Sequence, residues 1–438
     1  MIVVVGAGAA GFMAAIFAAG GPGESGAARF ASARVLLVER TAEGGKKILM
    51  SGGGRCNVLP SELDPARYVT ASSPNTMKKM LLSWPLREQR RFFEETLEMP
   101  LALEEETGKL FPAANKAREV RDRLRALAER LGVEVRGDAL VTGLEPAPAS
   151  APVNAASPAP PHAGGWRVRL ASGETIEAER VIVATGGLSV PATGSDGTGI
   201  DIVRGLGHTI HDLYPALTPL TASPHRYAPL AGVSLPVTIT APGTKPRFRT
   251  HGGFLFTHKG YSGPSVLNAS HLAILSKRAG GPRQALQVQW TELDEAEWDR
   301  RLLAREGTVG SLLRRHLPTR LVDALLADSG VEGALPLGNL DRESRRRVVE
   351  VLTRHPLPWT GDEGYAKAEV TGGGVALEEV DPRTLESRLH PGLHLCGEIL
   401  DAFGPIGGYN FAWAWATGRA AGTAAREGIL KRETGRHP

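Results

Sequence analysis

The first nineteen residues constrain the fold of this chain more than any other stretch. Ile2–Val5 is a continuous β-branched run, followed by Gly6-Ala7-Gly8-Ala9-Ala10-Gly11 and an alanine-rich segment up to Ala19. The run predicts a buried strand and the alanine-rich segment a helix. A GxGxxG pattern between a strand and a helix is typical of a dinucleotide-binding unit. Gly6 permits the tight turn, Gly8 lets the backbone approach a pyrophosphate, and Gly11 allows close helix–strand packing.

The next apolar run completes a strand–helix–strand unit. Arg34–Glu39 predicts a second buried strand, so the chain opens as a βαβ unit of a parallel sheet. Glu39, followed by Arg40, stands at its end, where an acid accepts hydrogen bonds from a ribose 2′-OH and repels a 2′-phosphate. The tightly held nucleotide is therefore expected to be FAD or NAD, with its phosphates at the helix start around Ala9 and Ala10.

A second glycine-rich segment spans residues 44–57 and reads Gly-Gly-Lys-Lys-Ile-Leu-Met-Ser-Gly-Gly-Gly-Arg-Cys-Asn. Three successive glycines let a backbone pass close to a flat ring. Three cations in the segment bring positive charge to phosphates or to a reduced flavin. The candidate cofactor contacts in this segment are Lys46, Lys47, Ser51, Gly52, Gly53, Gly54, Arg55, Cys56 and Asn57.

Two later segments also predict turns beside a ligand. Val181–Ala184 predicts a buried strand that ends in Thr-Gly-Gly, and the glycine-rich segment 396–410 precedes a helical stretch, Phe411–Ala425. Asp401 can hold ribityl hydroxyls, and the positive end of the last helix can stabilise charge on a reduced ring. The candidate contacts are Ala184, Thr185, Gly186, Gly187, Gly397, Glu398, Asp401, Gly407, Gly408, Tyr409 and Asn410, with Ala139 and Leu140 near the strand predicted at 133–135.

The pattern of elements predicts an α/β chain with a Rossmann-like domain interrupted by an insertion. The domain is expected at 1–194 and 366–438, and a β-rich substrate domain at 195–365 with a helical piece at about 294–355. A helix is expected at 119–131 and strands at 166–170, 237–240, 254–257 and 285–290. The glycine-rich segment 20–33 and the Pro/Ala-rich segment 146–165 are expected to be surface loops, the latter within a β-meander.

Composition excludes several classes of protein. The chain has 438 residues and a net charge of +4, from 51 basic and 47 acidic residues mixed along the sequence. The densest basic run, Arg345–Arg347, is flanked by Glu343 and Glu350 and indicates a solvated helix face, so no nucleic-acid partner is expected. Two distant cysteines exclude a disulfide scaffold and favour a reduced, cytoplasmic setting. No signal peptide or membrane span is expected.

Taken together, these motifs resemble one flavoprotein family. The loop from Gly45-Lys46-Lys47 to Asn57 looks like the signature of the BaiN-like, or aminoacetone-oxidase-like, NAD(P)/FAD-dependent oxidoreductases. Similar segments occur along nearly the whole chain, at 108–112, 116–117, 215–220, 253–258, 262–264 and 371–375. The resemblance implies non-covalent FAD at the residues named above, a β-barrel-like insert and a small helical piece. Tyr261 stands where a small aliphatic residue is commoner, and this departure bears on the substrate.

The resemblance leaves the reaction open. No second GxGxxG stands between a predicted strand and a predicted helix, so NAD(P)H is expected to bind transiently if it is the electron donor. One alternative is NAD(P)H-dependent reduction of a small unsaturated or carbonyl substrate, a second is oxidation of a small amine with transfer to oxygen, and a third is a non-catalytic flavin-binding protein. The candidate catalytic residues are His258, because histidine is the usual general acid or base near neutral pH, and Cys56. No metal site is predicted, and the oligomeric state stays open.

Overall fold

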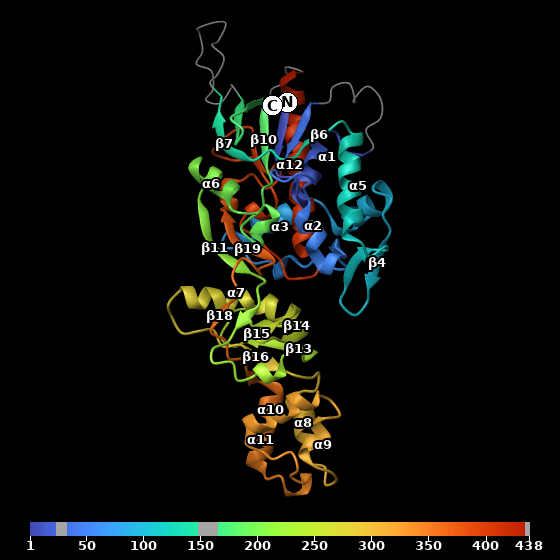
Figure 1. Ribbon diagram of the computed structural model, residues 1–438, viewed down its shortest axis with the longest axis vertical. Helices are drawn as coiled ribbons and strands as arrows, with labels where there is room; N and C mark the ends of the chain where they lie inside the picture. The colour runs from blue at the N-terminus through green and yellow to red at the C-terminus, as the bar shows by residue number, and fades with distance from the viewer. Residues whose placement is uncertain (23–32, 148–164, 434–438) are drawn as a thin grey trace. The chain divides into compact units, whose positions relative to one another are not determined.

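The computed structural model describes residues 1–22, 33–147 and 165–433, and these divide into two compact units (Figure 1). Unit 1 comprises Met1–Leu213 and Val370–Pro438, and unit 2 comprises Tyr214–Glu369. Unit 2 is thus an insertion in unit 1. The insertion was expected at 195–365; the structure assigns residues 195–213 to unit 1. The predicted loops at 20–33 and 146–165 lie largely outside the described residues.

Unit 1 is built on a five-stranded sheet in which every described pair of neighbours runs parallel. The strand order is β20-β10-β1-β2-β6. All four residues of β1 and of β2 are buried, because helices or loops cover both faces of a parallel sheet. The βαβ prediction is therefore confirmed. The strands are β1 (Ile2–Val5), β2 (Val35–Val38), β6 (Glu134–Arg136), β10 (Arg180–Val183) and β20 (Leu393–Leu395).

Two helices from opposite ends of the chain lie side by side in unit 1 (Figure 1). These are α1 (Ala9–Ala18) and α12 (Tyr409–Glu433), and their contact depends on small residues. A Cβ on Gly418 would lie 2.4 Å from the backbone oxygen of Ala10, and one on Gly422 would lie 2.2 Å from that of Ala14. The C-terminal helix therefore holds the glycine turn after β1 in place.

The rest of unit 1 consists of shorter elements around this sheet. The antiparallel β7-β8-β9 meander confirms the expected one, and α5 confirms the helix expected at 119–131. Other pairings are β3-β5-β4 and β11-β19. These elements are β3 (Leu59–Pro60), β4 (Leu101–Glu104), β5 (Lys109–Pro112), β7 (Val141–Pro146), β8 (Trp166–Leu170), β9 (Thr175–Ala178), β11 (Ile210–Ala216), β19 (Val370–Val375), α2 (Lys46–Met50), α3 (Pro74–Leu81), α4 (Leu86–Arg91), α5 (Ala117–Arg130) and α6 (Thr198–Gly205).

Unit 2 is built on a seven-stranded antiparallel sheet and has its own hydrophobic core. The strand order is β17-β16-β13-β14-β15-β12-β18. Its strands are β12 (Leu220–Thr221), β13 (Ser234–Ala241), β14 (Phe248–Phe256), β15 (Gly260–Ser262), β16 (Gln287–Gln289), β17 (His355–Pro356) and β18 (Gly361–Asp362). Its helices are α7 (Pro264–Arg278), α8 (Glu295–Leu302), α9 (Val309–Leu313), α10 (Thr319–Ser329) and α11 (Arg342–Thr353), and the last four form the expected helical piece.

Both cysteines are free and buried. None of the helices among residues 1–22, 33–147 and 165–433 is long and apolar enough to cross a membrane.

Candidate functional site

The glycine turn after β1 has the geometry that a phosphate-binding turn needs. A Cβ on Gly11 would lie 1.7 Å from the backbone oxygen of Gly6, so only glycine fits where the helix meets the turn. Gly8 begins α1 without a side-chain cap, and a Cβ there would meet nothing within 4 Å. The first hydrogen bond of the helix runs from Phe12 N–H to Gly8 C=O. The N–H groups of Ala9 and Ala10 therefore have no partner inside the helix, as an anion-binding helix start requires.

Glu39 stands at the carboxyl end of β2, beside the same turn. Its Oε2 accepts a hydrogen bond from Ala7 N–H at 2.8 Å, and its Oε1 accepts two from Thr41, at 2.9 Å from N–H and 2.8 Å from the hydroxyl. A carboxylate offers about four acceptor positions, so one is left for a ribose hydroxyl. The neighbouring Ala139 N–H donates to the Glu39 backbone oxygen at 2.8 Å, which brings the 139–140 segment to this carboxylate.

Two of the other predicted residues near this end of the sheet make different contacts. Arg40 pairs with Asp196 and donates to the backbone oxygen of Gly194 at 3.5 Å. Leu140 is half-buried, and its backbone oxygen accepts from Ala171 N–H at 2.8 Å. Arg40 thus binds the loop that follows β10 to the end of β2.

The run Ser51–Gly54 forms an exposed tight turn after α2. Gly52, Gly53 and Gly54 have φ angles of +56°, +67° and +86°, a left-handed run that costs other residues about 1 kcal/mol or more at each position. A Cβ on Gly53 would meet nothing within 4 Å. The turn therefore presents bare backbone at the surface, as the prediction of close approach to a flat ring requires.

The cations of this segment are used in three different ways. Arg55 lies over the ring of Phe111 at 4.1 Å and pairs with Glu104 at 3.0 Å, so it anchors the turn. Lys46 is exposed. Lys47 is half-buried and turns into the unit, where it joins a network of polar contacts.

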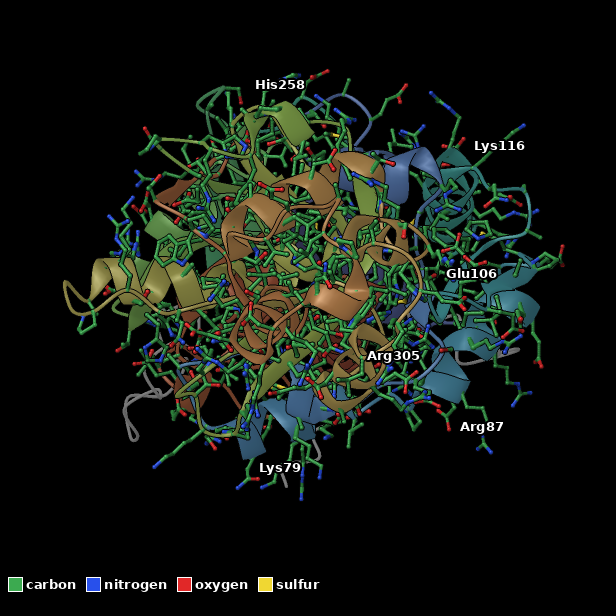
Figure 2. The ribbon with its side chains drawn as sticks, turned by 90° about the horizontal axis from the view of Figure 1, so that it is seen from below. Lys79, Arg87, Glu106, Lys116, His258 and Arg305 are labelled. Carbon is green, nitrogen blue, oxygen red and sulfur yellow. The ribbon has the colours of Figure 1, made fainter. Side chains whose placement is uncertain are left out.

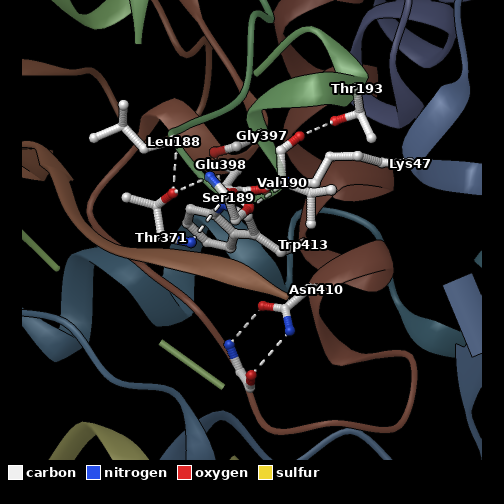
Figure 3. A network of polar contacts seen from close by, with 11 residues as sticks. Lys47, Leu188, Ser189, Val190, Thr193, Thr371, Gly397, Glu398, Asn410 and Trp413 are labelled. Atoms are coloured by element: carbon white, nitrogen blue, oxygen red, sulfur yellow. Dashed lines mark hydrogen bonds and ion pairs between the residues drawn. The ribbon is translucent and has the colours of Figure 1, made fainter. Parts of the chain in front are cut away.

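The Lys47 network connects four segments that are far apart in sequence (Figure 3). The Nζ of Lys47 donates to Ser189 Oγ at 2.6 Å and to Glu398 Oε2 at 2.7 Å. Glu398 Oε1 accepts from Ser189 Oγ at 2.8 Å and from the backbone N–H of Thr371 at 3.0 Å. The hydroxyl oxygen of Thr371 accepts from the N–H of Leu188 at 2.7 Å. The network ties the lysine-rich segment to the turns after β10 and β20.

The turn after β10 lies against the first glycine turn. A Cβ on Gly6 would lie 2.7 Å from the backbone oxygen of Ala184, and one on Gly187 would lie 2.3 Å from Thr371 Oγ1. Gly186 has a φ of +74°. The hydroxyl oxygen of Thr185 is buried, and no hydrogen-bond partner exists for it in the described part of the chain. A buried hydroxyl without a partner of this kind fits a hydrogen bond to a bound ligand.

Asp401 is 2% exposed and is held by four donors. Thr70 and Ser72 hydroxyls and the N–H groups of Ala71 and Ser72 all donate to its Oδ2, at 2.8–2.9 Å. In the described residues its Oδ1 accepts no hydrogen bond, so one oxygen of this fixed carboxylate stays available to ribityl hydroxyls. His211 Nε2 lies 3.8 Å from Oδ2 and is buried without a hydrogen-bond partner among the described residues.

The start of α12 is fitted tightly to the segment that follows Cys56. A Cβ on Gly408 would lie 2.4 Å from the carbonyl carbon of Leu59. The Asn57 amide, oriented to satisfy both neighbours, accepts from Gly408 N–H and donates to Leu59 C=O, each at 3.0 Å. The loop Gly404–Gly407 is held by Asn410, whose side chain bonds both backbone groups of Gly404 at 2.8 and 2.9 Å.

Two remaining candidates near α12 are also positioned by contacts. Tyr409 is 5% exposed, and its hydroxyl oxygen accepts a hydrogen bond from Arg67 at 2.9 Å. This tyrosine therefore anchors the start of the helix. Gly397 donates its N–H to Thr417 Oγ1 at 3.0 Å, and a Cβ on it would lie 2.7 Å from the Cβ of Ala10. The turn after β20 therefore lies against the start of α1.

The two candidate catalytic residues have very different environments. Cys56 is fully buried, and burial raises the pKa of its thiol to about 12, although a hydrogen bond from Ser51 lowers it. A protonated, buried thiol is a weak nucleophile, so the geometry gives redox chemistry at Cys56 no support. His258 is exposed in the turn between β14 and β15, in unit 2 (Figure 2).

Several residues that the sequence analysis did not single out complete this arrangement. They are Thr70, Ser72, Ser189, His211 and Thr371, which hold Glu398 and Asp401 or lie beside them. Isolated threonines, serines and histidines have no local pattern that distinguishes them from surface residues. Only Thr371 lies in a recognisable segment, the Thr-Gly-Gly-Gly-Val of β19.

The site fits a dinucleotide such as FAD on four independent observations. They are the open helix start at Gly8, the fixed carboxylates of Glu39 and Asp401, and the orphaned hydroxyl of Thr185. All of them belong to unit 1, as do the glycine turns that connect them. The five predicted segments therefore meet in one region.

Known proteins are similar to this chain over almost its whole length. Residues 1–424 match a family profile described as "HI0933-like protein Rossmann domain". A 3-dehydro-bile acid delta(4,6)-reductase from Clostridium scindens is 31% identical over 434 residues, which cover 97% of this chain and 99% of the relative. A ribosomal RNA dihydrouridine synthase from Escherichia coli is 32% identical over 425 residues, which cover 95% of both chains.

Solved structures show the same fold at lower identity. A 3-ketosteroid delta1-dehydrogenase from Sterolibacterium denitrificans, solved in complex with 1,4-androstadiene-3,17-dione, is similar with a TM-score of 0.50 and 13% identity. The match covers 98% of this chain and 99% of that one.

Proposed function

Since this chain belongs to the HI0933-like family of Rossmann-fold flavoproteins and is an FAD-dependent oxidoreductase, we propose that it reduces a carbon–carbon double bond conjugated to a carbonyl group, with NADH or NADPH as electron donor. The observation that carries the proposal is the pair of relatives that align over at least 95% of the chain, one a delta(4,6)-reductase and the other a dihydrouridine synthase.

The two names describe the same bond chemistry on different molecules. A 3-dehydro bile acid with delta(4,6) unsaturation carries double bonds conjugated to a ketone. Uridine carries a ring double bond conjugated to a carbonyl, and dihydrouridine is its reduced product. Hydride addition to the far carbon of such a system places negative charge on the carbonyl oxygen, so one flavin site suits both substrates.

The single dinucleotide-binding motif supports a transient electron donor. Only the GxGxxG at residues 6–11 follows a strand of a parallel sheet and opens a helix, and unit 2 is built on an antiparallel sheet, unlike the parallel sheets that hold nicotinamide dinucleotides. We therefore infer that NADH or NADPH reduces the flavin and leaves before the unsaturated substrate binds.

Bound FAD supplies the hydride chemistry, and the chain supplies binding, orientation and charge. The open start of α1 at Ala9 and Ala10 would hold the pyrophosphate, and Glu39 would hold the adenosine ribose. Asp401 Oδ1 would hold a ribityl hydroxyl. Lys47, fixed by Glu398 and Ser189, would place a positive charge beside the cofactor.

The test is anaerobic mixing of the yellow protein with NADPH and then NADH, following the visible flavin absorbance. We expect fast bleaching with at least one donor. The reduced flavin should then be reoxidised by a steroid 4,6-dien-3-one, while the saturated 3-ketone of the same skeleton, a matched control, has no effect.

Bleaching no faster than photoreduction, on protein that dithionite does reduce, would refute NAD(P)H-dependent reduction. Formation of peroxide with small amines and oxygen would then favour the amine-oxidase alternative. Reduction by NAD(P)H with equal reoxidation by the dienone and the saturated ketone would refute the conjugated double bond as the reacting group.

A further inference from the structure

The β-sheet part of unit 2 has an unusual charge balance. Residues 214–293 contain eight lysines and arginines but a single carboxylate, Glu292, whereas the whole chain has 51 basic and 47 acidic residues. The excess of positive charge in this segment arises because acidic residues are scarce in it. A net charge of +4 for the chain conceals this local concentration.

One face of the sheet in unit 2 is polar over the middle of β13, β14 and β16. Antiparallel partners lie on the same face of a sheet, so the register of β13 with β14 and β16 defines its members. Thr238 is paired with His251 and Gln289, and Thr240 is paired with Arg249 and Gln287. The alternate residues, such as Ile239 and Val288, are fully buried in the core of the unit.

This polar face is hollowed. A depression of about 460 Å³ is lined by Thr238, Arg249, His251, Gln289 and Glu292. Thr238 is 6% exposed and lies at its floor, where its hydroxyl is hydrogen-bonded to His251 Nδ1 at 3.2 Å. Lys245 and Arg247 lie beside it in the exposed turn between β13 and β14.

The cations at this face are not held in ion pairs among the described residues. Lys245, Arg247 and Arg249 form no ion pair with any carboxylate in the described part of the chain. Arginines of the helical piece of the same unit behave differently, because Arg300 pairs with Glu297 and Arg314 with Asp323.

We infer that this face, formed by β13, β14 and β16, binds the sugar–phosphate backbone of RNA. Unpaired arginine and lysine are the groups that contact phosphates, and threonine and glutamine bond phosphate and ribose oxygens. The lining of the depression lacks the large aromatic and aliphatic side chains that anchor protein partners or enter membranes. The choice of RNA over DNA rests on the proposed function, because uracil, the base with the conjugated double bond, belongs to RNA.

The test measures binding of a fluorescein-labelled, uridine-containing RNA hairpin to the full-length flavoprotein by anisotropy over a series of salt concentrations. We expect the double variant Arg247→Ala/Arg249→Ala to bind about tenfold or more weakly and to lower the slope of log affinity against log salt by about two. The control variant, Arg300→Ala/Arg314→Ala, removes two exposed arginines that are already paired, and should bind within about twofold of the parent protein.

Three outcomes would overturn the inference. The first is that the parent protein does not bind the RNA hairpin. The second is that both double variants lose the same affinity for it, and the third is that the DNA hairpin of the same sequence binds equally tightly. Flavin absorbance and the thermal unfolding midpoint show that each variant is folded. Anaerobic flavin reduction by NADPH needs no RNA, so a failure of the proposed function is recognised separately.

Discussion

Replacing Gly8 by alanine separates cofactor binding from folding. A Cβ at Gly8 meets nothing within 4 Å of the protein, and the residue has a φ of −87°, which alanine adopts without strain. Alanine is a poorer N-cap than glycine by about 0.5 kcal/mol, and the stiffer unfolded chain returns about 0.4–1 kcal/mol. The free energy of unfolding of the apoprotein should therefore change by less than about 0.5 kcal/mol.

The same methyl group would stand where the pyrophosphate has to approach the helix. Losing one or two charge-assisted hydrogen bonds, each about 1.5–3 kcal/mol, corresponds to at least about tenfold weaker FAD binding. Gly11→Ala is a poorer test, because its Cβ would lie 1.7 Å from the backbone oxygen of Gly6 and the turn itself would be disrupted.

The assay is a titration of apoprotein with FAD, followed by flavin fluorescence, beside urea unfolding of the same apoprotein. Gly205→Ala is the matched control, since a Cβ at Gly205 also meets nothing within 4 Å, and it should bind FAD as the parent does. Parent-like affinity of Gly8→Ala would refute the placement of the pyrophosphate at this helix start.

Three further predictions concern polar and titratable groups. In a double-mutant cycle of urea unfolding, Lys47→Met and Glu398→Gln should show a coupling energy of about 1 kcal/mol, as expected for an ion pair whose side chains are 29% and 20% exposed. Additive effects of the two substitutions on the free energy of unfolding would contradict the ion pair. Iodoacetamide should label neither Cys56 nor Cys396 in the native protein at neutral pH, because burial raises the pKa of both thiols, that of Cys56 to about 12. A labelled cysteine in the mass spectrum of the native protein would contradict this prediction. Burial lowers the pKa of His271 from 6.5 to about 4, so between these values the unfolded chain binds more protons and stability falls as the pH falls, by up to about 3 kcal/mol. The urea midpoint of His271→Gln should therefore lose less between neutral pH and pH 4 than that of the parent, and equal losses would refute the assignment.

Much of unit 1 was predictable because its signals are local. The β-branched run of β1, the glycines at 6, 8 and 11 and the alanines of α1 act through backbone preferences that neighbouring residues share. The strand order was not predictable in this way. Leu393–Leu395 pairs with β10 across some 210 positions of chain, and only the packed sheet brings them together.

The candidate site shows the same division. Glycine-rich segments indicated which parts of the chain approach a ligand, and residue type indicated that Glu39 and Asp401 were acceptors. The functions of the cations were not predictable, since Arg55 and Lys47 stand in one loop but find Phe111 and Glu398 as partners. The side chains of arginine and lysine are long enough to reach several different partners. The segments that pack against the loop determine which partner each of them contacts.

The sequence by itself therefore determined backbone conformation, the position of the glycine turns and the class of cofactor, because those properties depend on adjacent residues. Only the tertiary structure decided which side chains meet, that Thr371 and Ser189 hold Glu398, and that Arg249 lies unpaired in a polar hollow beside Thr238. The physical reason is that ion pairs and hydrogen bonds form over a few ångströms of space, and separation along the chain does not report that distance.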